Sequence, residues 1–230
     1  MATATLADGR ILIVGGAGEG FSLTPSPSSR NIWPRPVEAI EGAAAVEIYS
    51  PRTGRSQAIH HGEIENRFLA TLTAIQGEQN RFLLAGGVTV GEEGSLNLLQ
   101  RTLLLTVEGD EITVEEVPQG KLQLVGHRAV SFPGGPVLLW GGVLPEECPC
   151  NSTLMSCDEG CGCDTLCPGV PTTLGYIYRG AGLIPVTDIF LTMEGQLVPS
   201  AFGVLAPLGQ GQRLIAGGGV ELGPSLIPPS

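Results

Sequence analysis

The residues best suited to covalent or metal chemistry are six cysteines gathered in one short segment. This segment is rich in Gly, Pro and Asp and has too few apolar residues to build a core of its own, so it favours three disulfides. Sequence alone leaves all 15 pairings open. The competing interpretation is a soft metal ion such as zinc, although single-residue gaps between paired cysteines fit zinc sites poorly. The six residues are Cys148, Cys150, Cys157, Cys161, Cys163 and Cys167.

Disulfides would place the chain in an oxidising compartment, so we expect an extracellular, cell-surface or periplasmic location. The first residues lack the basic start and apolar core of a signal peptide. The expected location therefore requires an export signal upstream of Met1 in the native protein. The alternative is a cytosolic chain.

Other residue patterns do not assemble a catalytic centre. The acidic pairs Glu92-Glu93, Glu115-Glu116 and Glu146-Glu147 are adjacent in sequence, so in a strand the two side chains of each pair point to opposite faces. The chain has no G-x-S-x-G nucleophile motif and no glycine spacing of the G-x-G-x-x-G kind that binds phosphate. We expect no catalytic residues, no metal site, no cofactor and no enzyme activity in this chain alone.

The elements that position these groups repeat along the chain. Four strand-like apolar runs each end in two glycines, and each is preceded by a second short apolar run, which predicts a recurring hairpin. The high content of Gly and Pro also favours many short strands over helices. The four doublets are Gly15-Gly16, Gly86-Gly87, Gly141-Gly142 and Gly217-Gly218.

Two further strands follow the hairpin in the first three repeats. In repeat three we expect them at 188–193 and 196–199, because the sequence LTMEG at 191–195 resembles LTVEG at 105–109 of repeat two. The fourth repeat contains only its first hairpin. The predicted repeats are 1–62, 63–120, 121–200 and 201–230 of a single domain, with a Ser- and Pro-rich loop insertion at 18–42 and a Cys-rich one at 145–171.

The segment 3–16, followed by 46–54, resembles the bacterial kelch repeat that also occurs in galactose-oxidase-like propellers. The resemblance implies an all-β, kelch-type β-propeller with four-stranded antiparallel blades around a channel. Glycine doublets suit the end of an inner strand near a crowded axis, where a Cβ would clash or φ must be positive. The apolar runs suit strands covered on both faces. An unrelated β-sandwich with ordinary hairpin glycines is the alternative.

The repeats amount to about three and a half to four blades, fewer than a closed ring usually needs. An unclosed propeller would expose the apolar face of its last sheet. We therefore expect a partial chain, or an assembly in which another copy or a partner chain completes the ring. A compact domain with one reduced fourth blade is the alternative.

Galactose-oxidase-like enzymes hold copper with tyrosines and histidines, and this chain has three of each. We expect Tyr49 to pack within a blade and His60-His61 to lie in a solvated turn, while His127 could line a channel mouth but has no obvious partner. Tyr176 and Tyr178 complete the set. Copper oxidation is therefore not predicted.

Composition excludes several partners. The formal charge of −11 disfavours nucleic acid and anionic lipid, and no apolar run is long enough for a membrane span. The predicted function is a non-enzymatic scaffold that binds a protein or carbohydrate through its rim loops, with the ligand-binding residues unknown. The alternatives are part of a galactose-oxidase-like or carbohydrate-active enzyme, whose catalytic residues lie outside this chain, and a structural subunit of a larger assembly.

Overall fold

All regular elements in the described part of the chain are β-strands. The computed structural model describes residues 1–16, 21–22, 35–36, 46–90, 96–122, 124–147, 166–172, 174–186, 200–201, 204–208, 213–217 and 220–221. Within these ranges no helix has the length and hydropathy needed to cross a bilayer.

Three four-stranded antiparallel sheets follow one another along the chain, and a two-stranded sheet comes after them. Within each four-stranded sheet the strands lie in chain order from one edge to the other, which confirms the predicted blades. Blade 1 contains β1 (Ala2–Thr5), β2 (Ile11–Val14), β5 (Val46–Ser50) and β6 (Arg55–Ile59). Blade 2 contains β7 (Thr71–Ala74), β8 (Arg81–Ala85), β11 (Leu103–Glu108) and β12 (Glu111–Glu116). Blade 3 contains β13 (Arg128–Ser131), β14 (Val137–Trp140), β17 (Gly175–Tyr178) and β18 (Leu183–Val186), and blade 4 contains β20 (Val204–Leu208) and β21 (Arg213–Gly217).

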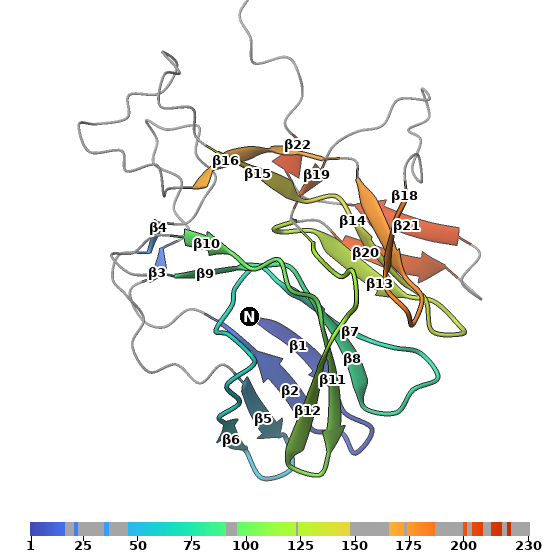
Figure 1. The fold of residues 1–230 in the computed structure, drawn as a ribbon. Helices are drawn as coiled ribbons and strands as arrows, with labels where there is room; N and C mark the ends of the chain where they lie inside the picture. Colours follow the sequence, from blue (N-terminus) through green and yellow to red (C-terminus); the bar gives the residue numbers. More distant parts are fainter. Residues whose placement is uncertain are drawn as a thin grey trace, which may run out of the picture.

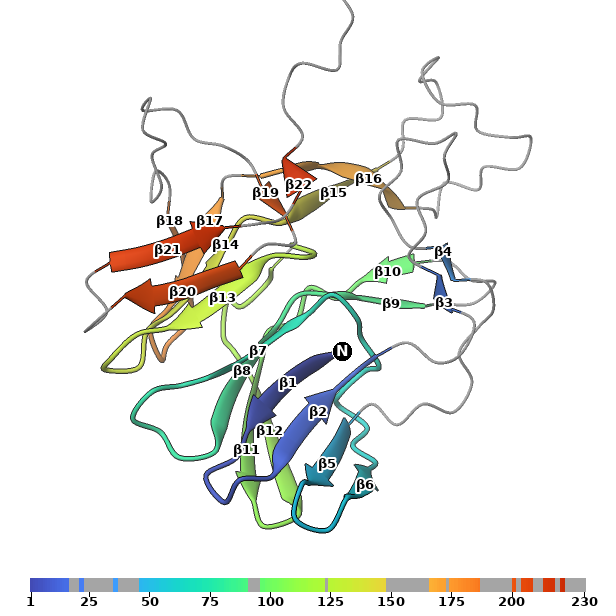
Figure 2. The ribbon, with the colours of Figure 1, turned by 180° about the vertical axis from the view of Figure 1, so that it is seen from behind.

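The first strands of the blades lie next to one another around a common axis. β1 contacts β7, β7 contacts β13, and β13 contacts β20. Figures 1 and 2 show the sheets fanned out from this line of first strands. The strands that end in glycine doublets are thus second from the axis in each sheet, one position further out than the innermost strand.

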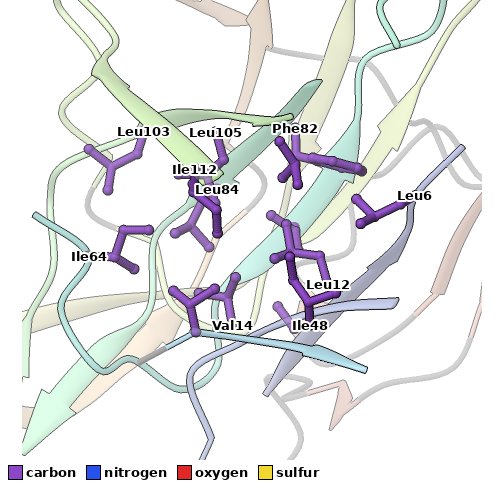
Figure 3. Packing of buried hydrophobic residues seen from close by; sticks show 14 residues of the cluster. Leu6, Leu12, Val14, Ile48, Ile64, Phe82, Leu84, Leu103, Leu105 and Ile112 are labelled. Carbon is purple, nitrogen blue, oxygen red and sulfur yellow. The ribbon is translucent and has the colours of Figure 1, made fainter. Parts of the chain in front are cut away.

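The core lies between the blades, and β8 shows how one strand serves two neighbours. Phe82 and Leu84 face blade 1, whereas Leu83 and Ala85 face blade 3, because successive side chains of a strand point to opposite faces. All four are buried, and so is the run 137–140, which confirms for these two strands the prediction of cover on both sides. In the run 11–14 only Leu12 and Val14 are buried, while Ile11 and Ile13 are half-buried, so for that strand the prediction is wrong. Figure 3 shows Leu84 and Phe82 meeting Leu12 of blade 1. Each fully buried leucine contributes about 1.5–3 kcal/mol of hydrophobic free energy.

The predicted outer strands of repeat three are wrong. The third and fourth places in blade 3 belong to β17 and β18, which pair with β14 and with each other. The sequence likeness between 191–195 and 105–109 predicts the third and fourth strands of repeat three at 188–193 and 196–199, which lie outside the described residues. The pairing partner of β14 comes directly after the Cys-rich insertion, in a stretch whose Gly and Pro content hid its strand character.

The turns at the far end of blades 1 and 2 are joined by polar contacts. Arg10 forms ion pairs with Asp8 and Asp110, and its Nη2 donates to the carbonyl oxygen of Gly109 at 2.7 Å. The backbone N–H of Ala7 donates to the side chain of Asn80, also at 2.7 Å. These contacts fix the two blades at the edge opposite the glycine doublets.

Candidate functional site

Short β-ribbons extend from one edge of the blades, the edge at which β2, β8 and β14 end. We call this edge the hairpin face. Each ribbon lies within the connection between the second and third strands of its blade, and Figures 1 and 2 show all three on the same side of the sheets. They are β3 (Phe21–Ser22) with β4 (Arg35–Pro36), β9 (Val88–Val90) with β10 (Leu96–Leu98), and β15 (Val143–Glu147) with β16 (Leu166–Pro171). In addition, β19 (Ser200–Ala201) pairs with β22 (Val220–Glu221).

Both predicted insertions belong to this face. The Ser- and Pro-rich insertion 18–42 contains β3 and β4, and the Cys-rich insertion 145–171 contains most of β15 and all of β16. The sequence predicted loops without strands here, so the paired ends are a correction. Short pairing segments such as Phe21–Ser22 carry no period that a sequence pattern could reveal.

In blades 1 to 3 the glycine doublets lie between the second strand and the ribbon that follows it. A Cβ on Gly15 would lie 1.6 Å from the carbonyl oxygen of Arg67, and a Cβ on Gly86 would lie 2.4 Å from that of Leu124. The next glycine of each doublet donates its N–H to the same oxygen, from Gly16 to Arg67 at 3.1 Å and from Gly87 to Leu124 at 3.4 Å. The doublets therefore seat the linker that leads into the next blade, and any side chain would push that linker away.

Arg67 is a fully buried cation in the linker between blades 1 and 2. Its Nη1 donates to the carbonyl oxygens of Gly86 and Arg101, both at 3.3 Å, and its Nη2 to Glu65 at 3.0 Å. Burial lowers the pKa of Arg67, and the carboxylate of Glu65 opposes that shift. The guanidinium thus joins the linker to the end of β8 and to the residues before β11.

His127 occupies the linker between blades 2 and 3. Its Nε2 lies 2.8 Å from the hydroxyl of Thr71, the first residue of β7. The ring is 5% exposed, and its Nδ1 makes no hydrogen bond within the described residues. Burial lowers the pKa of His127 to about 4, and the carbonyl of Leu124 opposes the shift. The imidazole is therefore neutral at physiological pH. The expectation that His127 has no partner is wrong, because its Nε2 lies within hydrogen-bond distance of Thr71 of blade 2. The side chain is buried, so it does not present itself to an open channel mouth either.

Arg128 begins β13 beside this histidine and is also buried. It lies opposite Trp140 in the register of β13 and β14, with its guanidinium carbon 5.3 Å from the centre of the indole ring. This is cation–π geometry, and it places a second buried arginine at the edge where the ribbons begin. Burial lowers the pKa of Arg128.

Of the six cysteines, only Cys167 lies within the described residues. It belongs to β16, where the backbone register places it opposite Glu146 of β15. The other five lie outside the described part, so both the disulfides and the metal alternative stay predictions. In the part that is described, no three His, Cys, Asp or Glu side chains gather to hold a metal ion.

The tyrosines and remaining histidines lie in different blades. Tyr49 is half-buried in β5, as expected, and Tyr178 in β17 donates its hydroxyl to the carbonyl oxygen of Gly180 at 3.3 Å. Tyr176 packs against the core between blades 2 and 3. His60 is exposed and His61 half-buried just after β6, where Nδ1 of His61 accepts from the N–H of Glu63 at 3.4 Å.

Two of the acidic residues have arginine partners on blade 2. Glu115 pairs with Arg81 at 3.3 Å and Glu116 with Arg101 at 2.9 Å. All four side chains are substantially exposed, so these ion pairs are solvated and contribute little to stability. Glu92 and Glu93 lie outside the described residues.

Sequence reasoning missed Arg67, Thr71 and Arg128. Their types carry no motif, and only the packing of one linker on the next blade buries them. A weak signal existed, since Arg67 comes shortly before β7 and His127 directly before β13. At these places a polar side chain can satisfy linker carbonyls or a neighbouring hydroxyl.

Comparison with known proteins bears on the fold. No family model and no curated protein matches the sequence. The solved structure of YjhT is similar, with a TM-score of 0.60, 12% identity, and coverage of 96% of this chain and 62% of that chain. A fungal alcohol oxidase of the AA5 family, in complex with copper, matches at a TM-score of 0.41, 12% identity, 88% of this chain and 45% of its own, a likeness too low to bear on the fold. The chain thus spans less than two thirds of YjhT, and its arrangement of blades is that of a kelch-type β-propeller.

Proposed function

We propose that the chain is a binding scaffold whose hairpin face takes up a protein or carbohydrate ligand. One observation carries the proposal. The two long insertions, far apart in sequence, occupy the same topological connection in blades 1 and 3, so both project from one face of a rigid set of sheets. Loops held by a rigid scaffold are where binding residues concentrate, because the strands serve the core.

Two further features support this role. The cysteines fall within one of the two insertions, which suits a segment that must keep a fixed shape outside the blades and favours an exported protein. The formal charge of −11 favours a neutral or basic ligand over a nucleic acid. Catalysis is not part of the proposal.

The ribbons allow each insertion to be removed without disturbing the blades. Glu147 pairs with Leu166, and Ser22 pairs with Arg35, so an Asn-Gly turn can close either ribbon after 148–165 or 23–34 is deleted. A matched control replaces 91–95 by Asn-Gly between the paired residues Val90 and Leu96 of blade 2.

The three variants and the unaltered chain are assayed on an array of defined oligosaccharides and against a displayed peptide library, with thermal unfolding measured in parallel. We expect both long-insertion variants to lose binding while Tm stays within about 3 °C, and the blade 2 variant to keep binding. Binding that survives both deletions would contradict the proposal, as would a chain that binds neither kind of probe.

A further inference from the structure

The outermost strand of each full blade is a sheet edge, and the three edges differ in what their residues allow. An edge strand leaves a row of backbone N–H and C=O groups unpaired, so it can accept another extended chain. Proteins prevent such pairing with charges, prolines or bulges along the edge. Among the described residues, the edges are formed by β6 in blade 1, β12 in blade 2 and β18 in blade 3.

Blades 2 and 3 each carry one of these protections. On β12, Glu111, Glu115 and Glu116 place three exposed carboxylates along the edge. On β18, Pro185 is exposed and has no backbone N–H to donate. Neither of these two strands is therefore suited to accept a further strand.

The edge of blade 1 has neither protection. β6 pairs with β5 through all of its residues, from Arg55 to Ile59, without a bulge. Ser56, Gln57 and Ala58 are exposed and uncharged, and the strand contains no proline. Its only charge is that of Arg55, at the end next to the turn. Figures 1 and 2 show β6 at the outer margin of blade 1, away from the ribbons of the hairpin face.

The charges around β6 indicate the kind of chain that would fit this edge. Arg52 lies in the turn between β5 and β6, Arg55 begins β6, and both side chains are exposed. Within the part of the chain that the structure describes, neither forms an ion pair, whereas Arg10, Arg67, Arg81 and Arg101 all do. The sequence has no carboxylate between 48 and 62. In a chain of formal charge −11, this edge is locally basic, so an acidic partner is complementary to it.

We propose that β6 accepts an extended acidic peptide of a partner protein by β-strand addition. The backbone of the peptide pairs with the outer edge of β6, and a carboxylate of the peptide pairs with Arg52 or Arg55. Main-chain hydrogen bonds supply affinity, while the two arginines set the preference for acidic sequences. This edge is a second binding surface, separate from the hairpin face.

Fluorescence anisotropy of a labelled peptide tests the proposal on the full chain. The probe is a short peptide in which glutamate alternates with valine or threonine, and its glutamine counterpart is the charge control. We expect the acidic probe to bind at least about tenfold more tightly than the glutamine probe, and more weakly as salt is raised. A fully N-methylated acidic probe, which cannot donate main-chain hydrogen bonds, should not bind.

Two charge reversals identify the edge that is used. Arg55→Glu should weaken binding of the acidic probe by at least about tenfold. Arg179→Glu is the matched control, because Arg179 is exposed in the turn between β17 and β18 and has no ion-pair partner among the described residues. It should change the affinity by less than about twofold. Thermal unfolding checks that both variants fold, and Arg55→Gln takes the place of Arg55→Glu if the latter does not.

Hydrogen exchange locates the bound probe. Amides of 55–59 should exchange more slowly in the complex, while those of β12 and of the hairpin-face ribbons should not change. The proposal would be overturned if the acidic probe did not bind, if the N-methylated probe bound equally well, or if 55–59 gained no protection. Equal weakening by Arg55→Glu and Arg179→Glu would also overturn it. Dimerisation of the free chain that slows exchange of the same amides would assign the edge to a second copy instead.

Discussion

Gly15→Ala tests whether the glycine doublets exist to let the linkers pass. The alternative is that they serve only a turn with positive φ. The control is Gly54→Ala, because the two glycines have nearly equal φ, +65° at Gly15 and +66° at Gly54. They differ in surroundings. A Cβ on Gly15 would sit 1.6 Å from the carbonyl oxygen of Arg67, while a Cβ on Gly54 would meet nothing within 4 Å.

The expected magnitudes follow from these two environments. A left-handed conformation costs an alanine about 1–2 kcal/mol, and both variants bear that cost. Gly15→Ala must in addition move main-chain atoms of Arg67, which no side-chain rotation can relieve, at a further cost of about 1–3 kcal/mol or more. The variants should therefore differ by about 2 kcal/mol, which for a chain of this size corresponds to a difference of about 4–8 °C in Tm.

Thermal unfolding followed by circular dichroism measures both variants under one condition. Urea titration then gives the free energy of unfolding, provided that the slope with denaturant is unchanged. Equal losses in Gly15→Ala and Gly54→Ala would refute the crowding argument and leave backbone conformation as the reason for the doublet. A second comparison repeats the test in blade 2, with Gly86→Ala against Gly109→Ala at φ of +62° and +63°.

Three further perturbations test the buried and bridging polar groups. The folded-state pKa of His127 is about 4, below the ordinary value of 6.5, so the stability that its neutral form contributes is present above pH 6.5 and is lost as the pH falls towards 4. In His127→Gln, the free energy of unfolding should therefore fall by about 3 kcal/mol less over this pH range than in the native chain. Urea titration at several pH values measures this difference. A variant as steep as the native chain would contradict the assignment. Arg67→Met removes the donor to the carbonyls of Gly86 and Arg101 and should lower the free energy of unfolding by about 2–3 kcal/mol. The control, Arg55→Met on an exposed strand, should change it by less than about 0.5 kcal/mol. Equal effects of the two variants in thermal melts would refute the role of Arg67. Arg10→Ala removes a partly exposed ion pair with Asp110 and should lower the free energy of unfolding by no more than about 1 kcal/mol at low salt, and by less at 1 M NaCl. A larger decrease that does not depend on salt would show that the contact is not mainly electrostatic.

The repeating blades could be predicted from sequence because two local signals agree. Apolar runs such as 82–85 mark strands buried on both sides, and the doublets mark where those strands end. Both depend on contacts within one repeat and its neighbours, so a pattern of residue types records them. The outer strands of blade 3 escaped prediction because a second segment, 191–195, looks more like the outer strand of blade 2 than β17 does.

Little of the candidate site could be predicted. The insertions were found by composition, but their common face depends on both being connections between second and third strands, and that follows only once β14 is known to pair with β17. The burial of His127 and Arg67 depends on how each linker lies across the next blade's glycines. No periodicity encodes that contact, since the linkers have no regular structure.

The paired ribbon β15–β16 has a practical consequence. Its two strands bring Glu147 and Leu166 together before the chain departs into the Cys-rich segment, so the ends of that segment are already closed by backbone pairing. The entropic cost of closing a loop rises only slowly with loop length, and the paired ribbon already holds the two ends of this loop together. A foreign peptide or small domain grafted between these residues should leave the melting temperature of the sheets nearly unchanged, which makes this junction a suitable port for displaying engineered epitopes.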